Sequence, residues 1–351
     1  MFNIQLLLKE TSVRHASDLH IVEGYYPTIR INSKLLYLRE FGLVQKEDAD
    51  TLPRVLLNKF QQQIFSENKE IDFSYPFGEL RFRVNLYQVK GSSAASLRLI
   101  PPTIKTMEEL NLPEIFNTFT TYKQGLILFT GPTGEGKSTS LAAIINDFNT
   151  KESEHIITIE DPIEFMYPKS RSIVSQREIG QDTLSWSGAL KSVLREDPDI
   201  VLVGEMRDYE TIQSVLTVAE TGHLVFSTLH TGSATEAINR IIDVFPAHQQ
   251  NQVKSSLANS LIAVVAQRLL PSSDGNSRVP AIEILLNGSS VAPLIREGKV
   301  FQLDNVIETS EKSGMILFEK YLAKLYEAGR ITKETAHAYA IRKNIITHLI
   351  P

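Results

Sequence analysis

The second two-thirds of the chain alternates short apolar runs with segments of helical periodicity. Each apolar run is continuous along its length, which is typical of parallel strands buried on both faces of a sheet. The expected strands are residues 126–130, 155–160, 199–203 and 223–229. The helical patterns between them cover residues 137–149, 186–196 and 209–221. This alternation predicts a parallel α/β sheet, followed from about residue 234 by mostly helical chain with one hairpin around residues 272–276.

The first hundred residues show a different pattern, which is typical of a small α+β unit. We expect helices over residues 2–15 and 48–66, with strands within residues 19–31. Two β-rich runs joined through residues 91–93 predict a hairpin. Two consecutive prolines at 101–102 then interrupt the periodicity. The expected organisation is an N-terminal domain, a linker and a second domain, over residues 1–100, 101–122 and 123–351.

A glycine-rich segment between a predicted strand and a predicted helix matches the phosphate-loop pattern G-x-x-x-x-G-K-[ST]. Its glycines let backbone N–H groups surround phosphate oxygens, and the helix N-terminus adds partial positive charge. We expect Lys137 to neutralise the β- and γ-phosphates of ATP. Ser138, alone or together with Thr139, is expected to present a hydroxyl to Mg²⁺. The predicted nucleotide contacts are Gly131, Pro132, Thr133, Gly134, Glu135, Gly136, Lys137, Ser138 and Thr139.

Two other predicted strands run into carboxylates. Parallel strands share one carboxyl edge, so these side chains are expected near the γ-phosphate. One would orient or deprotonate the attacking water and another would hold Mg²⁺ or its water shell. We favour Glu164 as the base with Glu160 as the alternative, and we place Glu205 near the metal with Ser138. Each glutamate taken alone is equally well explained as a solvated turn residue.

Histidine and arginine side chains supply the remaining candidates. His230 closes the fourth predicted strand and could donate to the γ-phosphate, although a lone histidine there is more often structural. Phosphoryl transfer also needs positive charge opposite the phosphate loop. Arg81 and Arg83 share one face of a predicted strand, and Arg98 lies on its partner. The pattern alone leaves open whether these arginines reach a nucleotide or form a solvated surface.

Charge and composition exclude several classes of protein. The net charge of −5 and the lack of a basic stripe argue against a nucleic-acid partner. The absence of cysteine excludes disulfides and thiolate metal sites. We expect no signal peptide, because the N-terminus has no basic segment before its apolar residues and no small-residue cleavage site. We expect no direct membrane insertion, because no apolar run approaches the roughly 20 residues that span a bilayer. The expected protein is soluble and cytoplasmic, and reaches a membrane only through a partner.

The order of the motifs resembles the PilT/PilU branch of the secretion ATPases. The resemblance covers essentially the whole chain and is carried by residues 16–21, the phosphate loop, 158–165, 194–208 and 221–231. It implies a PAS-like N-terminal domain, a RecA-like P-loop ATPase domain and a homo-hexameric ring. It also implies ATP-driven retraction of type IV pili in twitching motility, and a pilus platform protein as partner at the inner membrane.

The resemblance also assigns roles to individual positions. Lys137 and Ser138 match the family's Walker A loop, and Glu205 matches its Walker B acid. Arg83 and Arg98 fall where the family places arginines that reach the nucleotide. Glu160, Asp161 and Glu164 match the aspartate box, and His223 and His230 match the histidine box.

Three positions depart from the family pattern. Glu135 stands where serine is usual, and a carboxylate beside triphosphate is unfavourable unless it points to solvent. Lys191 replaces an arginine and lacks its bidentate fork. Ala292 replaces an arginine in the segment that resembles the retraction motif, and together with residues 182–191 and 313–332 this favours the PilU-like side. These departures leave open whether the protein retracts pili alone or assists a paralogous retraction ATPase.

Three rival interpretations stand beside the retraction motor. An extension or secretion ATPase would typically carry extra N-terminal domains and a tetracysteine zinc insert, whereas this chain has no cysteine. An accessory ring subunit that binds ATP but hydrolyses it poorly is favoured by Glu135 and Lys191 and opposed by the intact glutamates. A nucleic-acid motor on the same core is opposed by the acidic charge balance.

Overall fold

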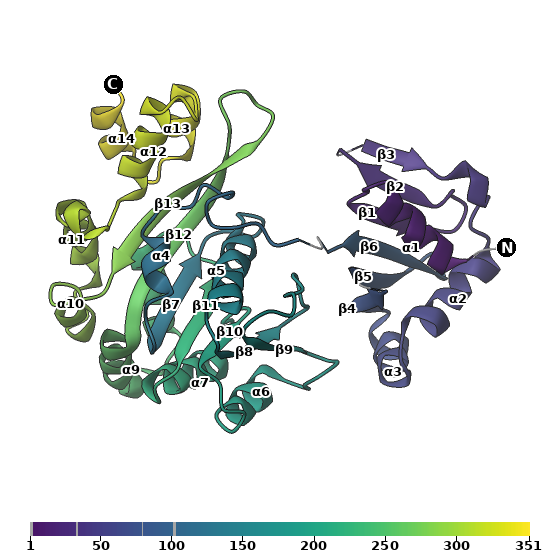
Figure 1. Ribbon diagram of the computed structural model, residues 1–351, viewed down its shortest axis with the longest axis horizontal. Helices are drawn as coiled ribbons and strands as arrows, with labels where there is room; N and C mark the ends of the chain where they lie inside the picture. The colour runs from purple at the N-terminus through teal and green to yellow at the C-terminus, as the bar shows by residue number, and fades with distance from the viewer. Residues whose placement is uncertain (1–2, 33, 79, 101–102) are drawn as a thin grey trace. The chain divides into compact units, whose positions relative to one another are not determined.

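The computed structural model describes residues 3–32, 34–78, 80–100 and 103–351 (Figure 1). Contacts within the chain separate two compact units. The first unit contains the chain up to Thr103 together with two short segments, Asp161–Met166 and Glu178–Asp182. The second unit contains Ile104–Glu160, Tyr167–Arg177 and Thr183–Pro351. The expected linker therefore lies in the second unit from Ile104 onward. Its first two residues, 101–102, lie outside the described residues. So do residues 1–2 of the expected N-terminal domain, the second of which was also expected to begin the first helix.

The first unit is built on an antiparallel sheet with the strand order β3-β2-β1-β6-β5-β4. The strands are β1 (Asp18–Ile21), β2 (Thr28–Ile31), β3 (Lys34–Tyr37), β4 (Glu70–Phe77), β5 (Leu80–Val89) and β6 (Ser92–Leu99). Three helices, α1 (Ile4–Val13), α2 (Lys46–Leu56) and α3 (Lys59–Asn68), share one apolar core with the sheet. Leu7, Leu52 and Phe82 belong to this core and are almost completely buried. The unit is the small PAS-like α+β domain that the sequence predicted.

Two sequence predictions in this unit need correction. The single helix expected over 48–66 is two helices, because Leu57 is extended and the side chain of Asn58 caps α3 by accepting from the Gln61 N–H at 2.9 Å. The hairpin turn expected at residues 91–93 is formed by Lys90 and Gly91, both with positive φ. Such a two-residue turn matches the twist of the flanking strands, so residues 92 and 93 already belong to β6.

The second unit is built on a seven-stranded sheet with the order β13-β12-β7-β11-β10-β8-β9. Its central strands are parallel, and the four predicted at residues 126–130, 155–160, 199–203 and 223–229 are confirmed, whereas the parallel strand β12 was not predicted. They are β7 (Gly125–Thr130), β8 (His155–Glu160), β10 (Ile200–Val203), β11 (Leu224–Leu229) and β12 (Leu261–Pro271), with β9 (Ile173–Glu178) at one edge. The predicted helices are confirmed as α5 (Lys137–Lys151), α6 (Trp186–Val193) and α7 (Tyr209–Glu220). This arrangement is the expected RecA-like domain.

The rest of the second unit is mostly helical, with the expected hairpin formed by β12 and the antiparallel β13 (Arg278–Leu286). The C-terminal helices α12 (Phe318–Glu327), α13 (Lys333–Tyr339) and α14 (Lys343–Leu349) lie beside this hairpin (Figure 1). They pack against it through an apolar cluster that includes Leu270, Phe318 and Leu322. No helix within the described part of the chain is long and apolar enough to span a bilayer. The remaining helices of the unit are α4 (Phe116–Phe119), α8 (Ala234–Asp243), α9 (Ala247–Ser260), α10 (Ala292–Arg296) and α11 (Leu303–Thr309).

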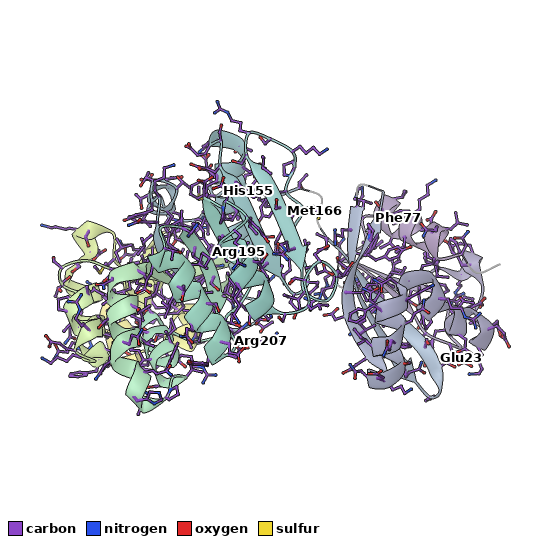
Figure 2. All side chains as sticks on the ribbon, turned by 90° about the horizontal axis from the view of Figure 1, so that it is seen from below. Glu23, Phe77, His155, Met166, Arg195 and Arg207 are labelled. Atoms are coloured by element: carbon purple, nitrogen blue, oxygen red, sulfur yellow. The ribbon has the colours of Figure 1, made fainter. Side chains whose placement is uncertain are left out.

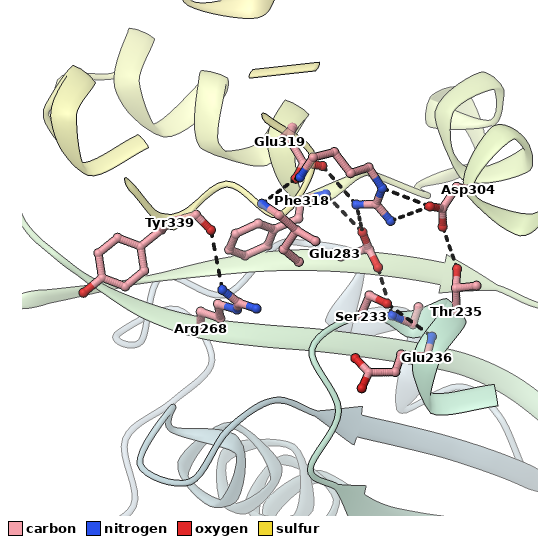
Figure 3. A network of polar contacts seen from close by, with 12 residues as sticks. Ser233, Thr235, Glu236, Arg268, Glu283, Asp304, Phe318, Glu319 and Tyr339 are labelled. Atoms are coloured by element: carbon pink, nitrogen blue, oxygen red, sulfur yellow. Dashed lines mark hydrogen bonds and ion pairs between the residues drawn. The ribbon is translucent and has the colours of Figure 1, made fainter. Parts of the chain in front are cut away.

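A buried ionic cluster connects these C-terminal helices to the sheet (Figure 3). The Arg342 guanidinium pairs with Glu283 at 2.9 Å, with Glu319 at 3.0 Å and with Asp304 at 2.8 Å. Burial raises the pKa of Glu283, although the charge of Arg342 opposes that shift. The second carboxylate oxygen of Glu283 accepts from the N–H of Ala234 at 2.9 Å. Arg342 therefore joins α14 to β13, α12, α11 and the start of α8.

Candidate active site

The phosphate loop lies between the end of β7 and the start of α5. Gly131 has a φ of 144°, and a Cβ there would lie 2.3 Å from the Gln267 carbonyl oxygen, so only glycine fits. Gly136, also with positive φ, is the N-cap of α5. The Lys137 side chain is buried, and its Nζ donates to the carbonyl oxygens of Gly131 at 2.5 Å and Pro132 at 2.9 Å. The ammonium group therefore lies against the loop backbone, where phosphate oxygens would bind.

Strand β12 holds this loop through side chains that the sequence patterns did not single out. The buried Gln267 accepts from the Ser140 hydroxyl at 2.8 Å and donates to the Glu135 carbonyl oxygen at 2.8 Å. The Glu135 carboxylate accepts from the Leu269 N–H at 2.5 Å. The negatively charged side chain of Glu135 therefore points toward the backbone of β12. The sequence did contain one signal for this contact, because Gln267 is a polar residue that directly follows the apolar run of residues 261–266.

Glu205 and His230 meet at the carboxyl ends of two neighbouring parallel strands, β10 and β11. His230 Nε2 lies 3.2 Å from a carboxylate oxygen of Glu205. The other oxygen of Glu205 pairs with Arg207 at 2.6 Å, and Arg207 is labelled in Figure 2. The end of β11 is paired with the end of β7, where the phosphate loop begins. These two predicted residues therefore lie at the sheet edge that carries the loop.

Two other predicted residues of the second unit, Glu160 and His223, lie at different ends of the sheet. Glu160 ends β8, is buried, and accepts from Thr158 Oγ1 at 2.6 Å and Gln176 Nε2 at 3.3 Å. His223 lies before β11, at the opposite end of that strand from His230. Its Nδ1 is 3.1 Å from both Thr221 Oγ1 and the Val218 carbonyl oxygen. These contacts give His223 a structural role away from the loop.

Both arginines implied by the family resemblance lie in the first unit and are engaged by carboxylates. Arg83 pairs with Asp72 at 2.6 Å and with Glu164 at 3.8 Å. Arg98 pairs with Asp18 at 2.9 Å. Burial would raise the pKa of Asp18, but hydrogen bonds from Ser17 and Arg98 outweigh burial, so the pKa of this carboxyl falls below its usual value.

The two aspartate-box glutamates belong to different units. Glu160 ends a strand of the second unit, whereas Glu164 lies in the segment Asp161–Met166 of the first unit. The candidate base therefore belongs to the same unit as Arg83 and Arg98, whereas Lys137, Glu205 and His230 belong to the second unit. Sequence spacing could not predict this division, because it depends on contacts between segments far apart in the chain.

The donors predicted for Mg²⁺ fit that ion chemically. Ser138 offers a hydroxyl near the start of α5, and Glu205 offers a carboxylate after β10. Both are hard oxygen donors, which Mg²⁺ prefers, and the ion usually completes its shell with water and phosphate oxygens. Bound there, Mg²⁺ would neutralise charge on the β- and γ-phosphates.

Known proteins resemble the chain over nearly its full length. The model of the family described as "Type II/IV secretion system protein" matches residues 4–293. The "Type IV pilus retractation ATPase PilT" of Pseudomonas aeruginosa is 44% identical over 339 residues, which cover 96% of this chain and 98% of that protein. The "Type IV pilus ATPase PilU" of the same organism is 41% identical over 345 residues, covering 98% and 90%. A crystal structure of the pilus retraction motor PilT with bound ADP matches with a TM-score of 0.91 and 41% identity, covering 99% of this chain and 100% of that one.

Proposed function

Because this chain belongs to the Type II/IV secretion system protein family, we propose that it is an ATP-driven motor for the retraction of type IV pili. The chain is a P-loop ATPase of the PilT/PilU type with a RecA-like domain. The observation that supports the motor role is the pairing of Glu205 with His230 at the same sheet edge as the phosphate loop. This edge supplies a cation for the phosphates, a carboxylate for the metal and a histidine beside it.

The proposed roles follow from the position of each group. The backbone of residues 131–139 and Lys137 bind the phosphates of ATP, while Ser138 and Glu205 bind Mg²⁺. Glu164 is the proposed base for the attacking water, and Glu160 is the alternative. Arg83 and Arg98 supply positive charge to the departing phosphate, either within one subunit or across a subunit interface. In this proposal, six copies form a ring at the cytoplasmic side of the inner membrane and act on the pilus platform protein.

The second candidate is an accessory PilU-like subunit that binds ATP and depends on a paralogous retraction ATPase. Glu135 was one of the two sequence features that favoured poor hydrolysis. Its carboxylate accepts from the Leu269 N–H, so it is directed toward β12, while its negative charge remains next to the loop. Lys191 in α6 remains a reason to test the accessory role.

Phosphate release by the purified protein tests the ATPase centre. We expect Lys137→Ala to abolish ATP binding, and Glu205→Gln to retain binding and lose turnover. Lys123→Ala is a matched control, because Lys123 pairs with Glu154 before β7, at the opposite end of that strand from the phosphate loop. Unchanged turnover in Lys137→Ala would contradict the proposal.

Complementation tests the motor role and separates it from the accessory one. The chain is expressed in cells that lack every retraction ATPase of their own, and pilus retraction is measured. Restored retraction supports an independent motor. Retraction that returns only when a paralogue is co-expressed supports the accessory subunit.

A further inference from the structure

Glu178 forms a buried polar junction inside the first unit. Its side chain is 1% exposed, although the preceding residues of β9 belong to the second unit. One carboxylate oxygen accepts from the Ser74 N–H at 3.0 Å and from Gln181 Nε2 at 2.5 Å. The other accepts from the Ser74 hydroxyl and from the Ile163 N–H at 3.2 Å. Arg81 supplies the compensating charge at 3.5 Å.

These contacts join the aspartate-box segment to β4. Ser74 lies in β4, and Ile163 directly precedes Glu164. The side chain of Glu164 has a second connection to the same unit through Arg83 at 3.8 Å. The backbone before Glu164 and its carboxylate are thus both tied to the N-terminal unit. Lys137, Glu205 and His230 are carried by the other unit.

We propose that Glu178 is a positioning residue for ATP hydrolysis, which fixes the backbone before Glu164 within the first unit and thereby holds the candidate base in place. The inference rests on the proposed function, because it takes Glu164 as the base. Loss of the junction should therefore lower turnover, while ATP binding by the phosphate loop does not require it.

The chemistry of the junction explains why a carboxylate is needed at this position. Four hydrogen-bond donors converge on two oxygen atoms, whose lone pairs can accept all of them, and Arg81 adds an ion pair. Glutamine has nearly the same shape but replaces one oxygen with a donor group, which would face N–H or O–H donors. Removing the charge also leaves Arg81 without its buried partner. Glu178→Gln is therefore a local change that weakens the connection between Ile163 and Ser74.

The test compares ATP binding with turnover in the full-length Glu178→Gln variant. We expect the affinity for ATP to be retained and kcat to fall by about 10²-fold, the loss typical of a misplaced reactive group. Hydrogen exchange at the Ile163 amide should become faster, whereas exchange in α5 should not change. Glu10→Gln is the matched control, because Glu10 also pairs with an arginine of the first unit, Arg14 on α1.

A double variant identifies whether Glu178 acts through Glu164. The variant that combines Glu178→Gln with Glu164→Gln should be no slower than Glu164→Gln alone. If Glu164→Gln keeps full turnover, the assignment of the base is wrong and the proposed chemistry fails. If Glu164→Gln is inactive but Glu178→Gln has a normal kcat, the base stands and the positioning role is overturned.

A milder variant keeps the inference testable if Glu178→Gln does not fold. Ser74→Ala removes the hydroxyl that donates to Glu178 and accepts from Arg81 Nε at 2.7 Å, and it leaves the Ser74 N–H in place. A lowered kcat with unchanged ATP affinity supports the positioning role. An unchanged kcat, in a variant whose Ile163 amide exchanges faster, overturns it.

Discussion

Arg83 and Arg98 lie directly opposite each other on β5 and β6 of the first unit. Like charges in this relationship repel, and carboxylates offset the repulsion. Asp18 on β1 lies directly opposite Arg98 and pairs with it, and Asp72 on β4 pairs with Arg83. If the arginines bind phosphate as proposed, the phosphate oxygens would compete with these carboxylates for the guanidinium groups.

Removing either arginine should slow hydrolysis more than it weakens binding. We expect Arg83→Ala and Arg98→Ala to lower kcat by about 10³-fold, because arginines that stabilise the transferring phosphate contribute on that scale. ATP affinity should change far less, since the phosphate loop is in the other unit. Single-turnover kinetics measure this, with Arg14→Ala as a control on α1. A normal kcat in both variants would identify the pair as a solvated surface.

The Asp18–Arg98 pair predicts a pH dependence of folding stability. The folded-state pKa of Asp18 is lowered, so the pair stabilises the fold above the unfolded-state pKa of about 3.9 and loses that contribution as the pH falls through the folded-state value. We expect Asp18→Asn to lower the free energy of unfolding at pH 7 and to have a smaller effect near pH 3. Denaturant unfolding at the two pH values measures the difference. An equal effect at both would show that the ion pair is not responsible.

Glu135 should contribute to the stability of the phosphate loop, whereas its negative charge should have little effect on ATP binding. Glu135→Ala leaves the Leu269 N–H without its acceptor, and we expect it to reduce the free energy of unfolding by about 1 kcal/mol. Glu135→Gln keeps an acceptor and removes the charge, so its ATP affinity should equal that of the unmodified protein. Calorimetric titration with ATP and thermal unfolding measure the two quantities. Much tighter ATP binding by Glu135→Gln would show that the carboxylate does repel triphosphate.

Arg342 should be among the most important side chains for the stability of the second unit. Arg342→Ala leaves two buried glutamates without their cation, and we expect a loss of about 3–5 kcal/mol in the free energy of unfolding. Lys324→Ala on α12 is the control, because its pair with Glu311 is exposed and should contribute little. Denaturant unfolding compares the two variants. Equal losses would argue against a special contribution from the buried cluster.

Much of the second unit could be predicted because burial on both faces leaves a clear pattern. The runs that became β7, β8, β10 and β11 are continuous and apolar, and each ends within one residue of its predicted boundary. The phosphate loop was equally visible, since its glycines are demanded by local backbone geometry. The break between α2 and α3 had a local signal, the capping pair of Asn58 and Gln61.

The features that the sequence could not reveal depend on distant contacts. Gln267 holds the phosphate loop only because β12 lies beside β7 in the sheet. Glu178 contacts Ser74, which is 104 positions away, and also the backbone before Glu164. Glu164 therefore belongs to the first unit, whereas Glu160 belongs to the second. No local periodicity encodes either relationship. Sequence spacing identified the chemical groups, while the tertiary fold determined which of them share a rigid unit.

The division of the chain has a mechanical consequence. The polypeptide passes from one unit to the other five times, after Thr103, Glu160, Met166, Arg177 and Asp182. A pull on either unit is therefore carried to the other through five covalent main-chain connections.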